Sequence, residues 1–532
     1  MKGSALRPHD MGALFDRAAA RGRTTTAHLD RPFDIAPGGG TSYDVAALAE
    51  LVREASGWWA AAGARRGGRV AILKDNHWDI DLLACAAVRA GAVPAKLSGH
   101  LPAETASALL KRLEPDVLLT TPEMIERAAA DGVDLTSFAR TAVSTGPAPG
   151  AVHLDELRGS PQRAPLRRGD DEPLVITHTS GTTGVPKLVV HSTRTIITHL
   201  ARFEALPAPV VGLRREDVLA TASAYAHGRT FCWTAVALSA APSEVVVLTG
   251  HEPDEVEPVL REHPPTVVEA LPASFVRMKP LTARGNSPFR RVRLFVSTYD
   301  AVHPPTARAY LKASERKRPF WIDGFGQTET GPLTFRVHHR GSVQRRRSET
   351  HRAGRPIPVK TRLKVVDPGT FQPVRPGEPG LVLVRTRALC LDYLGESDRF
   401  AAKKAGNWWN TGDLGVRGRD GSLHLLDREV DCAPAGSCVA TEDTLEERIP
   451  QALECVLLAR AEKPLLPVVV TSDGTLSEHT WRRACRGLQA MADPVSLTWD
   501  EVPRTGTGKV RRLALLTRLT GDADTYGTGR WT

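Results

Sequence analysis

The spacing of apolar positions changes regularly along the first part of the chain. Between residues 45 and 59 apolar side chains recur every three or four positions, which predicts an amphipathic helix. Residues 69–73 and 116–120 are short apolar runs typical of buried strands, and an apolar helix is predicted between them over residues 79–92. This alternation of strand and helix predicts parallel sheets that are covered by helices.

The same alternation continues through the middle of the chain and then stops. Further strands are predicted over 173–180, 243–249, 266–271 and 291–297. Beyond residue 355 the apolar segments become short and are divided by Gly and Pro, which indicates a β-rich subdomain. From residue 433 onward, strands and a helix over 477–491 predict a small α+β domain. We therefore expect an α/β protein with a large N-terminal domain of helix-covered sheets and a smaller C-terminal domain.

Length and composition agree with a globular protein of several domains. With 532 residues the chain is longer than one hydrophobic core usually serves. Hydrophobic residues make up 41% and charged residues 24%, which are proportions typical of globular proteins. No apolar run reaches the roughly 18–20 residues of a membrane-spanning helix, and the N-terminal residues lack the apolar core of a signal peptide. We expect a cytoplasmic protein that has no membrane partner.

The net charge of +10 does not by itself indicate binding to nucleic acid. No zinc-finger, RNP or basic-zipper pattern accompanies it, so we expect no nucleic-acid partner. The arginine-rich run over residues 336–347 is most simply a solvated loop, with a docking face for an acidic partner as the alternative. The seven cysteines are scattered and form no CxxC pair, which predicts neither a disulfide framework nor a cysteine metal site.

The stretch HTSGTTGVPK at residues 178–187 combines glycine, hydroxyl and lysine residues directly after a predicted strand. Gly181 and Gly184 permit backbone conformations in which successive N–H groups point at one anion. Lys187 adds a mobile positive charge. Hydroxyl donors come from Thr179, Ser180, Thr182 and Thr183. The loop suits a polyphosphate although it does not match the Walker pattern, and a flexible surface turn is the alternative.

Four later stretches carry residues suited to the rest of a nucleotide. The glycines of residues 323–331 allow the backbone to approach a flat ligand, and Glu329 is a suitable Mg²⁺ ligand. Asp413 follows a Thr-Gly turn, where its carboxylate can accept hydrogen bonds from both hydroxyls of a ribose. Arg428 lies at the end of a predicted strand, and Lys509 lies on a Gly-flanked loop near the C-terminus. Each of these taken alone could be a turn, a helix cap or a salt bridge.

In this order the motifs resemble those of the adenylate-forming superfamily, which contains acyl- and aryl-CoA synthetases, luciferases and peptide-synthetase adenylation domains. TSGTTGVPK matches the phosphate loop, GFGQTE the adenine and magnesium segment, TGD the ribose aspartate, DR the hinge-proximal arginine and PRTGTGK the catalytic lysine. The resemblance covers nearly the whole chain. It implies a ligase that uses ATP and Mg²⁺, in which a carboxylate attacks the α-phosphate, an acyl-adenylate and pyrophosphate form, and a nucleophile then displaces AMP.

The resemblance also implies roles for single residues and a division into domains. Thr328 and Glu329 would border the phosphates and the metal, Lys509 would bridge the carboxylate and the α-phosphate, and Lys187 would steady the leaving pyrophosphate. The remaining ATP-binding positions would be Thr179, Ser180, Gly181, Thr182, Thr183, Gly184, Gly324, Phe325, Gly326, Gln327, Asp413 and Arg428, the last two on the ribose. Residues 1–427 would form the N-terminal domain, 428–432 a hinge and 433–532 a mobile lid that carries the catalytic lysine.

The chain departs from the superfamily pattern near the expected position of the acid. Relatives carry a Ser-Gly-Gly-Ala-like turn after the strand that matches residues 291–297, whereas this chain reads STYDA over 297–301. Tyr299 would narrow the acid site and argue against a long fatty acyl chain. Asp300 could pair with an amine of the substrate or with the adenine amino group. The alternative is that the loop is shifted and Tyr299 belongs to the core.

A second stretch, SAYAHGRTF, roughly fits the aromatic and histidine segment that lines the acid site in relatives. By that match His227 would be a gate residue, and Arg229 would meet a polar group on the acid. A structural role is the alternative, because a lone histidine or arginine is more often structural. On the resemblance, we count His227, Arg229, Tyr299 and Asp300 as the expected substrate-binding residues.

The hinge region bears on the acceptor of the activated acid. Beyond Arg428 the segment that serves thioester formation in relatives is one residue short, so adenylation is better supported than transfer to CoA. We expect a ligase that activates a compact, aryl or polar carboxylic acid and passes it to a thiol, either CoA or a phosphopantetheine carrier protein. An amine acceptor, as in an amide synthetase, is the alternative within this class. A non-catalytic ATP-binding module is the alternative outside it.

Overall fold

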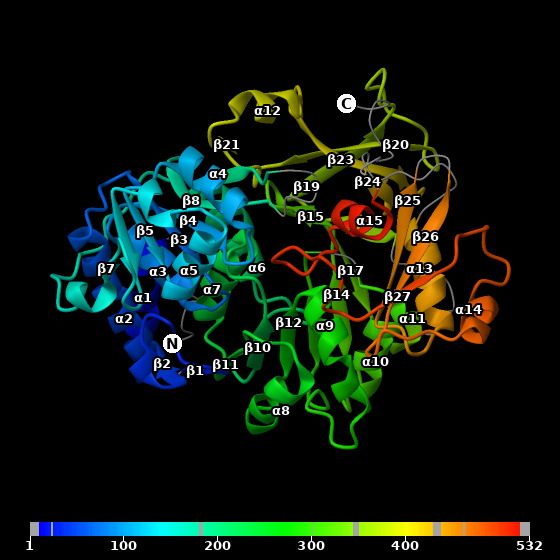
Figure 1. Cartoon of the computed structure of the whole chain (residues 1–532), viewed down its shortest axis with the longest axis horizontal. Coiled ribbons are helices and arrows are strands. Elements are labelled where there is room, and N and C mark those ends of the chain that lie inside the picture. Colours follow the sequence, from blue (N-terminus) through cyan, green and yellow to red (C-terminus); the bar gives the residue numbers. More distant parts are fainter. Residues whose placement is uncertain are drawn as a thin grey trace.

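The computed structural model describes residues 10–22, 25–179, 185–299, 302–343, 351–428, 438–460 and 463–521, with the side chains of all of them except 427 and 428. Within these ranges the strands form two large sheets and two small ones, with helices between and around them (Figure 1). The α/β fold class predicted from the sequence is confirmed.

The first large sheet is built mainly from the N-terminal part of the chain, and its central strands are parallel. Its described strands lie in the order β21-β9-β8-β4-β3-β5-β6-β7. Their bounds are β3 (Arg69–Lys74), β4 (Val93–Ser98), β5 (Val117–Thr120), β6 (Thr141–Ser144), β7 (Val152–His153), β8 (Pro173–His178), β9 (Leu188–Ser192) and β21 (Asp392–Tyr393). The strands predicted over 69–73, 116–120 and 173–180 are therefore confirmed.

The second large sheet begins with parallel strands from the middle of the chain. Its described strands lie in the order β19-β20-β23-β24-β18-β17-β14-β13-β12-β10-β11-β1-β2. The parallel part contains β1 (Thr26–Leu29), β10 (Val218–Ala222), β11 (Glu244–Val247), β12 (Val267–Ala270), β13 (Leu294–Ser297) and β14 (Phe320–Asp323), with β2 (Ser42–Asp44) antiparallel at the edge. The strands predicted over 243–249, 266–271 and 291–297 are confirmed, and the N-terminal strands β1 and β2 are an addition.

The sheet continues into the antiparallel strands of the β-rich segment. These are β17 (Thr334–His338), β18 (Arg352–Pro356), β19 (Thr361–Val366), β20 (Pro379–Thr386), β22 (Lys404–Ala405), β23 (Trp408–Arg417) and β24 (Leu423–Arg428). The prediction of a solvated loop over 336–347 is wrong for residues 336–343, because they complete β17 and form the short helix α11 (Arg340–Val343). Arg336 and His338 on β17 both contact the Asp323 carboxylate. The pattern of charges along the sequence did not reveal this partner, which lies on the neighbouring strand β14.

Helices cover both faces of the parallel parts of both large sheets, so the apolar core has several layers. Between the sheets lie α1 (Leu14–Ala19), α2 (Val45–Ala61), α3 (Asp79–Arg89) and α7 (Gly228–Ala240). On the outer faces lie α4 (Ala103–Leu113) and α5 (Pro122–Ala130) against the first sheet, and α8 (Pro253–Glu262), α9 (Pro272–Met278) and α10 (Pro304–Ala313) against the second. On β3, Val70 and Ile72 face the shared core while Ala71 and Leu73 face the outer helices. This period-two pattern is why buried parallel strands read as continuous apolar runs.

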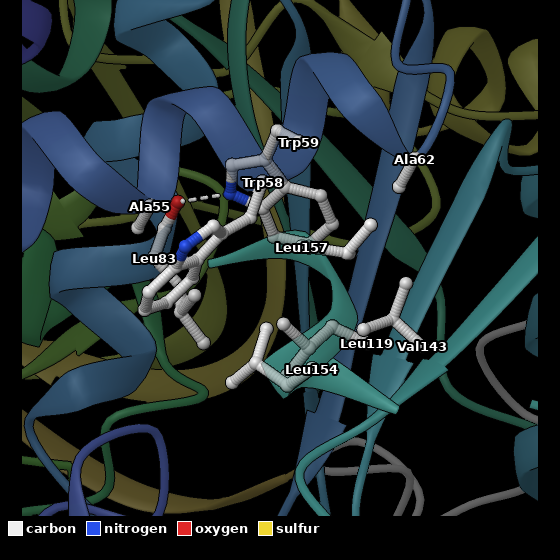
Figure 2. Close-up of a pocket in the computed structure, with 9 residues that line it drawn as sticks. All are labelled: Ala55, Trp58, Trp59, Ala62, Leu83, Leu119, Val143, Leu154 and Leu157. Atoms are coloured by element: carbon white, nitrogen blue, oxygen red, sulfur yellow. Dashed lines mark hydrogen bonds between the residues drawn. The ribbon is translucent and has the colours of Figure 1, made fainter. Parts of the chain in front are cut away.

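Two neighbouring tryptophans fix α2 against the first sheet (Figure 2). Trp58 and Trp59 line an apolar pocket together with side chains from α3, β5 and β6. The indole Nε1 of Trp59 donates a hydrogen bond of 3.0 Å to the Leu83 carbonyl oxygen. The guanidinium of Arg158 stacks over the Trp58 ring at 5.3 Å. The pocket is lined by apolar side chains throughout, so it serves packing and offers no chemistry.

The C-terminal elements form a separate small core on one side of the molecule (Figure 1). A three-stranded sheet of β25 (Glu454–Arg460), β26 (Lys463–Val470) and β27 (Val495–Leu497) lies between α13 (Cys438–Arg448) with α14 (Glu478–Ala484) and α15 (Arg512–Thr520). The predicted α+β composition is correct, but the helix predicted over 477–491 ends at Ala484. Gly487 adopts a φ of 74°, which no α-helix accommodates.

This C-terminal unit contacts α10 through charged side chains. The Nδ1 of His303, at the start of α10, lies 2.6 Å from the Asp443 carboxylate on α13. Arg308 on α10 and Glu447 on α13 form a second ion pair at 2.9 Å. The predicted hinge over 428–432 and the boundary at 433 fall largely on residues outside the described ranges. None of the described helices combines the length and the apolar character that a membrane crossing requires.

Candidate active site

The carboxyl ends of strands from both large sheets meet at one place, and the chemistry-bearing motifs lie there. The backbone N–H of Ser98, the last residue of β4, donates to His178 Nε2, the last residue of β8, at 3.1 Å. On the second sheet, Tyr299 follows β13 and its ring contacts His227 at the start of α7. Ligands of α/β proteins bind beyond the carboxyl ends of the strands.

Thr179 and Lys187 close the base of the glycine-rich loop. The Thr179 N–H donates to the Lys187 carbonyl at 3.0 Å, and the Lys187 N–H donates to Thr179 Oγ1 at 3.0 Å. These two bonds hold the two ends of the loop together, Thr179 after β8 and Lys187 before β9. The predicted phosphate ligands Ser180, Gly181, Thr182, Thr183 and Gly184 lie between them, outside the described residues.

Glu329 lies next to the base of this loop. Its side chain is buried, and its Oε1 accepts a hydrogen bond of 2.5 Å from the Tyr393 hydroxyl. The Lys187 ammonium lies over the Tyr393 ring at 5.1 Å from the centroid. Burial and, after it, the charge of Lys403 lower the pKa of Lys187. The lysine and the carboxylate therefore both contact one tyrosine, the lysine at its ring and the carboxylate at its hydroxyl, which suits a bound polyphosphate with its cation.

The segment around Gln327 connects the phosphate side with the residue predicted to bind ribose. Gln327 Nε2 donates to the Asp413 carboxylate at 2.9 Å and to the Thr411 carbonyl at 2.7 Å. The Trp409 indole donates to Gln327 Oε1 at 3.2 Å. Asp413 lies opposite Arg428 in the register of β23 and β24, and the Arg428 side chain lies outside the described part of the chain. The structure thus brings Gln327 and Asp413 together.

Two glycines of the same segment are required by close backbone contacts. A Cβ at Gly324 would lie 2.4 Å from the Thr334 carbonyl oxygen, and a Cβ at Gly326 would lie 2.6 Å from that of Gly331. Residues 326–327 and 331–332 form the short antiparallel pair β15 (Gly326–Gln327) and β16 (Gly331–Pro332). Phe325 packs at the edge of the β-rich core. Only glycine therefore fits at these two positions, because the backbone of a neighbouring segment lies directly against each of them.

His227 stands between the phosphate side and the expected acid site. Its Nε2 lies 3.3 Å from Thr328 Oγ1, and its carbonyl oxygen accepts from the buried Lys96 ammonium at 3.0 Å. Burial and, next, the positive charge of Lys96 lower the pKa of His227 to about 3. The weaker positive influences include Lys509. His227 is therefore neutral at physiological pH.

Tyr299 forms one wall of the space beside His227. Its side chain is half-buried, with a hydroxyl oxygen that solvent does not reach, and its ring meets that of His227 edge-on at 4.6 Å between centroids. Its φ of 82° lies in the left-handed region, which non-glycine residues rarely adopt. Such strain is retained when the surrounding structure or a function requires it. The neighbouring Asp300, the other residue predicted at this turn, lies outside the described residues.

Arg229 on α7 is held by two carboxylates. Its Nε and Nη2 donate to the two oxygens of Glu269 on β12 at 2.8 and 2.9 Å, and its Nη1 donates to Glu204. Burial opposes the charged form, but Glu204 and Glu269 outweigh it and raise the pKa of Arg229 well above the usual value. The guanidinium is thus engaged within the protein, in a bidentate pair that fixes its plane.

The turn that carries Lys509 rests on the ends of both large sheets. Thr505 and Lys509 close it by two hydrogen bonds, from Thr505 N–H to the Lys509 carbonyl at 2.8 Å and from Lys509 N–H to Thr505 Oγ1 at 3.2 Å. A Cβ at Gly506 would meet the Ser98 hydroxyl at 2.4 Å, and a Cβ at Gly508 would meet Ala273 Cβ at 2.4 Å. The C-terminal unit therefore delivers Lys509 to the place where the strands end.

Several residues of this site were missed by reasoning from the sequence. Tyr393 is an ordinary aromatic residue in a short strand and carries no local signal. Glu204 and Glu269 act only through Arg229, which is distant in the sequence. Glu269 did leave a signal, because it is a charged residue inside the apolar run of residues 266–271. A buried charge of this kind needs a partner, and that partner is Arg229.

Comparison with known proteins places this geometry in a family. The model of the family described as AMP-binding enzyme matches residues 15–394. The 3-amino-2-hydroxy-4-methoxybenzoate diazotase of Streptomyces cremeus is 35% identical over 96% of both chains. The 3-aminoavenalumate diazotase of a Streptomyces species is 26% identical over 85% of this chain and 80% of its own. Among solved structures, the anthranilate CoA ligase AuaEII in complex with anthranoyl-AMP superimposes with a TM-score of 0.79 at 21% identity, over 97% of this chain and 99% of that one.

Proposed function

The chain belongs to the AMP-binding enzyme family, and on that basis we propose that it adenylates nitrite with ATP and passes the nitroso group to an aromatic amine, as a diazotase. As a member of this family it is an AMP-forming ligase, and the proposal concerns its acid and its acceptor. In place of the thiol expected from the sequence, the acceptor is an amine.

The observation that carries the proposal is the position of the Tyr299 ring at the expected acid site. Tyr299 and the Arg229–Glu269 pair lie beside His227, where the motif order places the acid. Tyr299 has a left-handed backbone conformation that non-glycine residues rarely adopt. A small residue at this position would leave room for a larger acid. Nitrite has the bent O–N–O shape of a carboxylate group but carries no substituent on its central atom. It therefore suits a site in which the Tyr299 ring takes up room beside His227.

The names of the two diazotase relatives favour the same chemistry. Both name an amino-substituted carboxylate as the compound that is diazotised. Forming a diazo group from an amine adds one nitrogen atom. Because the reaction includes no oxidant or reductant, that nitrogen must arrive at the oxidation level of nitrous acid. Nitrite is the simplest oxyanion at that level, and adenylation makes its nitrogen electrophilic.

The reaction then balances in two steps. An oxygen of nitrite attacks the α-phosphorus, the bond to the β-phosphate oxygen breaks, and pyrophosphate leaves with the electron pair. The amine nitrogen next attacks the nitroso nitrogen, the bond to AMP breaks, and the amine loses one proton. The resulting N-nitrosamine tautomerises to a diazohydroxide, which takes up a proton and loses water to give the diazonium ion.

In the proposed mechanism the residues of the site bind, position and stabilise charge. Lys509 and Lys187 offset the negative charge that gathers on the α-phosphate and on the leaving pyrophosphate. Gln327 orients Asp413 for the ribose. His227 stays neutral and close to Thr328, so it can accept or donate a hydrogen bond at the reacting oxygens. The Lys509 turn covers the site and excludes water, which would otherwise hydrolyse the adenylate.

The residues beside Thr328 also fit the magnesium that this chemistry uses. Glu329 presents a buried carboxylate whose Oε1 is oriented by Tyr393, and Mg²⁺ prefers one or two carboxylates together with phosphate oxygens. When bound, the ion would neutralise charge on the phosphates.

A direct test measures pyrophosphate release with ATP and Mg²⁺, with either nitrite or an arylcarboxylate panel as the acid. The assay is run at mildly alkaline pH, because nitrite diazotises aromatic amines without an enzyme in acid. With isotopically labelled nitrite and an aminobenzoate, we expect labelled diazonium, trapped with a naphthol, that requires ATP. Pyrophosphate release that requires a benzoate, followed by acyl-CoA or amide formation, would instead identify an arylcarboxylate ligase.

Two lysine variants supply the matched control. Lys509→Ala should lower nitrite-dependent pyrophosphate release at least about 100-fold while ATP binding is largely kept. Lys317→Ala removes an exposed lysine of a surface loop and should leave the rate unchanged. Normal activity of the Lys509 variant would contradict its assignment.

A further inference from the structure

Three side chains with metal-binding atoms meet at the edge of the second large sheet, away from the active site. His28 lies on β1, Glu244 begins β11, and His263 follows α8. Glu244 Oε2 lies 2.9 Å from His263 Nδ1 and 3.4 Å from His28 Nε2. The two imidazole rings stack at 3.6 Å between centroids, with 17° between their planes. One carboxylate oxygen therefore faces a nitrogen of each of two histidines.

The fold brings these three residues to the same face of the sheet. Glu244 and Val246 are two apart on β11, and His28 is the register partner of Val246 on the neighbouring strand. Residues at these positions point to the same side. Val246 packs in the same core cluster as Val256 and Leu260 of α8. The end of α8 therefore lies above this face and places His263 over the other two side chains.

We propose that His28, Glu244 and His263 form a binding site for a divalent transition-metal ion, with Zn²⁺ as the physiological candidate. The three ligand atoms lie within 4.8 Å of one another. Tetrahedral zinc with bonds of about 2.0–2.2 Å requires ligand atoms about 3.3–3.6 Å apart, so the group needs only small adjustments. Two imidazoles with one carboxylate, and water as the fourth ligand, is a recognised zinc ligand set.

The exposure and orientation of the residues suit such an ion. His28 Nε2 and His263 Nδ1 both face Glu244 Oε2, so all three ligand atoms point into one place. The side chains of His28 and His263 are 18% exposed and that of Glu244 is 33% exposed, which gives an ion access without a rearrangement of the core. Mg²⁺ prefers oxygen ligands and therefore would not compete for this set.

The site has a structural consequence for the N-terminal part of the chain. β1 is joined to the body of the second sheet through β11, and β2 at the edge is held by β1 alone among the described strands. A metal ion bound by His28 and His263 would tie β1 to α8 as well as to its neighbouring strand. Because the ligands come from three elements, only the folded chain assembles them, and binding stabilises that state. Glu244 lies at the amino end of its strand, opposite to the end that forms the active site.

The test uses the full chain without a histidine tag, after removal of metals with EDTA. Equilibrium dialysis against Zn²⁺ should give one tightly bound ion per chain, and cobalt should give the absorption of a tetrahedral site. The variants His28→Asn and His263→Asn should each lower the zinc affinity at least about tenfold and abolish the cobalt spectrum. Glu262→Gln, which changes an exposed carboxylate next to His263, is the matched control and should bind as the parent does.

Thermal unfolding gives a second readout that does not depend on catalysis. Zinc should raise the midpoint of the parent and of the Glu262 variant by at least about 2 °C and leave that of either histidine variant unchanged. Ligase activity of each metal-free variant, equal to that of the metal-free parent, shows that the variants are folded. The proposal is overturned if the parent binds no zinc, or if both histidine variants bind it as tightly as the parent.

Discussion

The tyrosine at position 299 combines a hydroxyl group closed to solvent, a left-handed backbone and contact with a residue of the candidate active site. A left-handed conformation costs an L-residue about 1–2 kcal/mol. The surrounding structure holds Tyr299 at a φ of 82° with its ring against His227. Under the proposed function, this side chain excludes acids that are larger than nitrite.

Tyr299→Gly should widen the acid site. We expect pyrophosphate release with benzoates to rise at least about tenfold relative to nitrite, because a new pocket opens beside His227. Loss of a fully buried ring costs about 3–5 kcal/mol, loss of this half-buried ring costs less, and relief of backbone strain returns about 1–2 kcal/mol, so the free energy of unfolding should fall by less than about 3 kcal/mol.

Phe371→Gly is the matched control, because Phe371 has a φ of 55° and is 43% exposed. It relieves the same kind of strain far from the acid site and should leave the preference between acids unchanged. If Tyr299→Gly also leaves that preference unchanged, the tyrosine does not limit the size of the acid.

The turn from Thr505 to Lys509 is the element that brings the C-terminal unit to the active site. Its position depends on two glycines, because Cβ atoms at Gly506 and Gly508 would collide with Ser98 and Ala273. Gly508 also has a φ of 79°. The sequence showed these glycines as flanks of a lysine, and the structure shows the surfaces against which they lie.

Gly508→Ala should lift this turn and reduce adenylation. The added Cβ would lie 2.4 Å from Ala273 Cβ, so the turn must move by about an ångström, and such a displacement lowers the rate by about 100-fold. The measurement is the kcat of pyrophosphate release. Gly521→Ala is the control, because its φ of 72° imposes the same backbone strain and its Cβ would meet nothing within 4 Å. Equal effects of the two substitutions would show that strain alone, and not the seating of the turn, is responsible.

At the scale of the whole molecule, the contact between α10 and α13 holds the C-terminal unit against the rest. His303 lies between two buried carboxylates, with Nδ1 2.6 Å from Asp443 and Nε2 3.5 Å from Glu446. Burial alone would lower the pKa of His303, but Glu446 and Asp443 outweigh it and raise the pKa to about 10. Burial also raises the pKa of Glu446 to about 7.

Both shifts make this contact weaker as the pH rises. A histidine whose pKa is raised on folding contributes stability that is complete below pH about 6.5 and is lost as the pH rises toward about 10. Glu446 acts in the same direction between its ordinary value and about 7, because the folded state binds its proton more tightly. We therefore expect the thermal midpoint to fall between neutral pH and pH about 10.

The variant His303→Gln should flatten this dependence, because the titrating group is removed. His479→Gln changes an exposed histidine on α14 and should keep the slope of the parent. A variant at His303 that retains the full slope would assign the pH dependence to another group.

The sequence by itself determined most of the strands and helices of the α/β fold and the order of the nucleotide motifs. Apolar periodicity and glycine-flanked loops are local properties, so residues 69–73 or 323–331 could be interpreted without knowing their neighbours. Helix ends were predicted less well, because they depend on the backbone angles of single residues. The helix predicted to reach residue 491, for example, ends at Ala484. The tertiary structure alone decided the pairing of Arg229 with Glu204 and Glu269, the wall formed by Tyr299, and the meeting of His28 with Glu244 and His263. These residues are far apart along the chain, and only the packing of sheets and helices determines which of them come into contact.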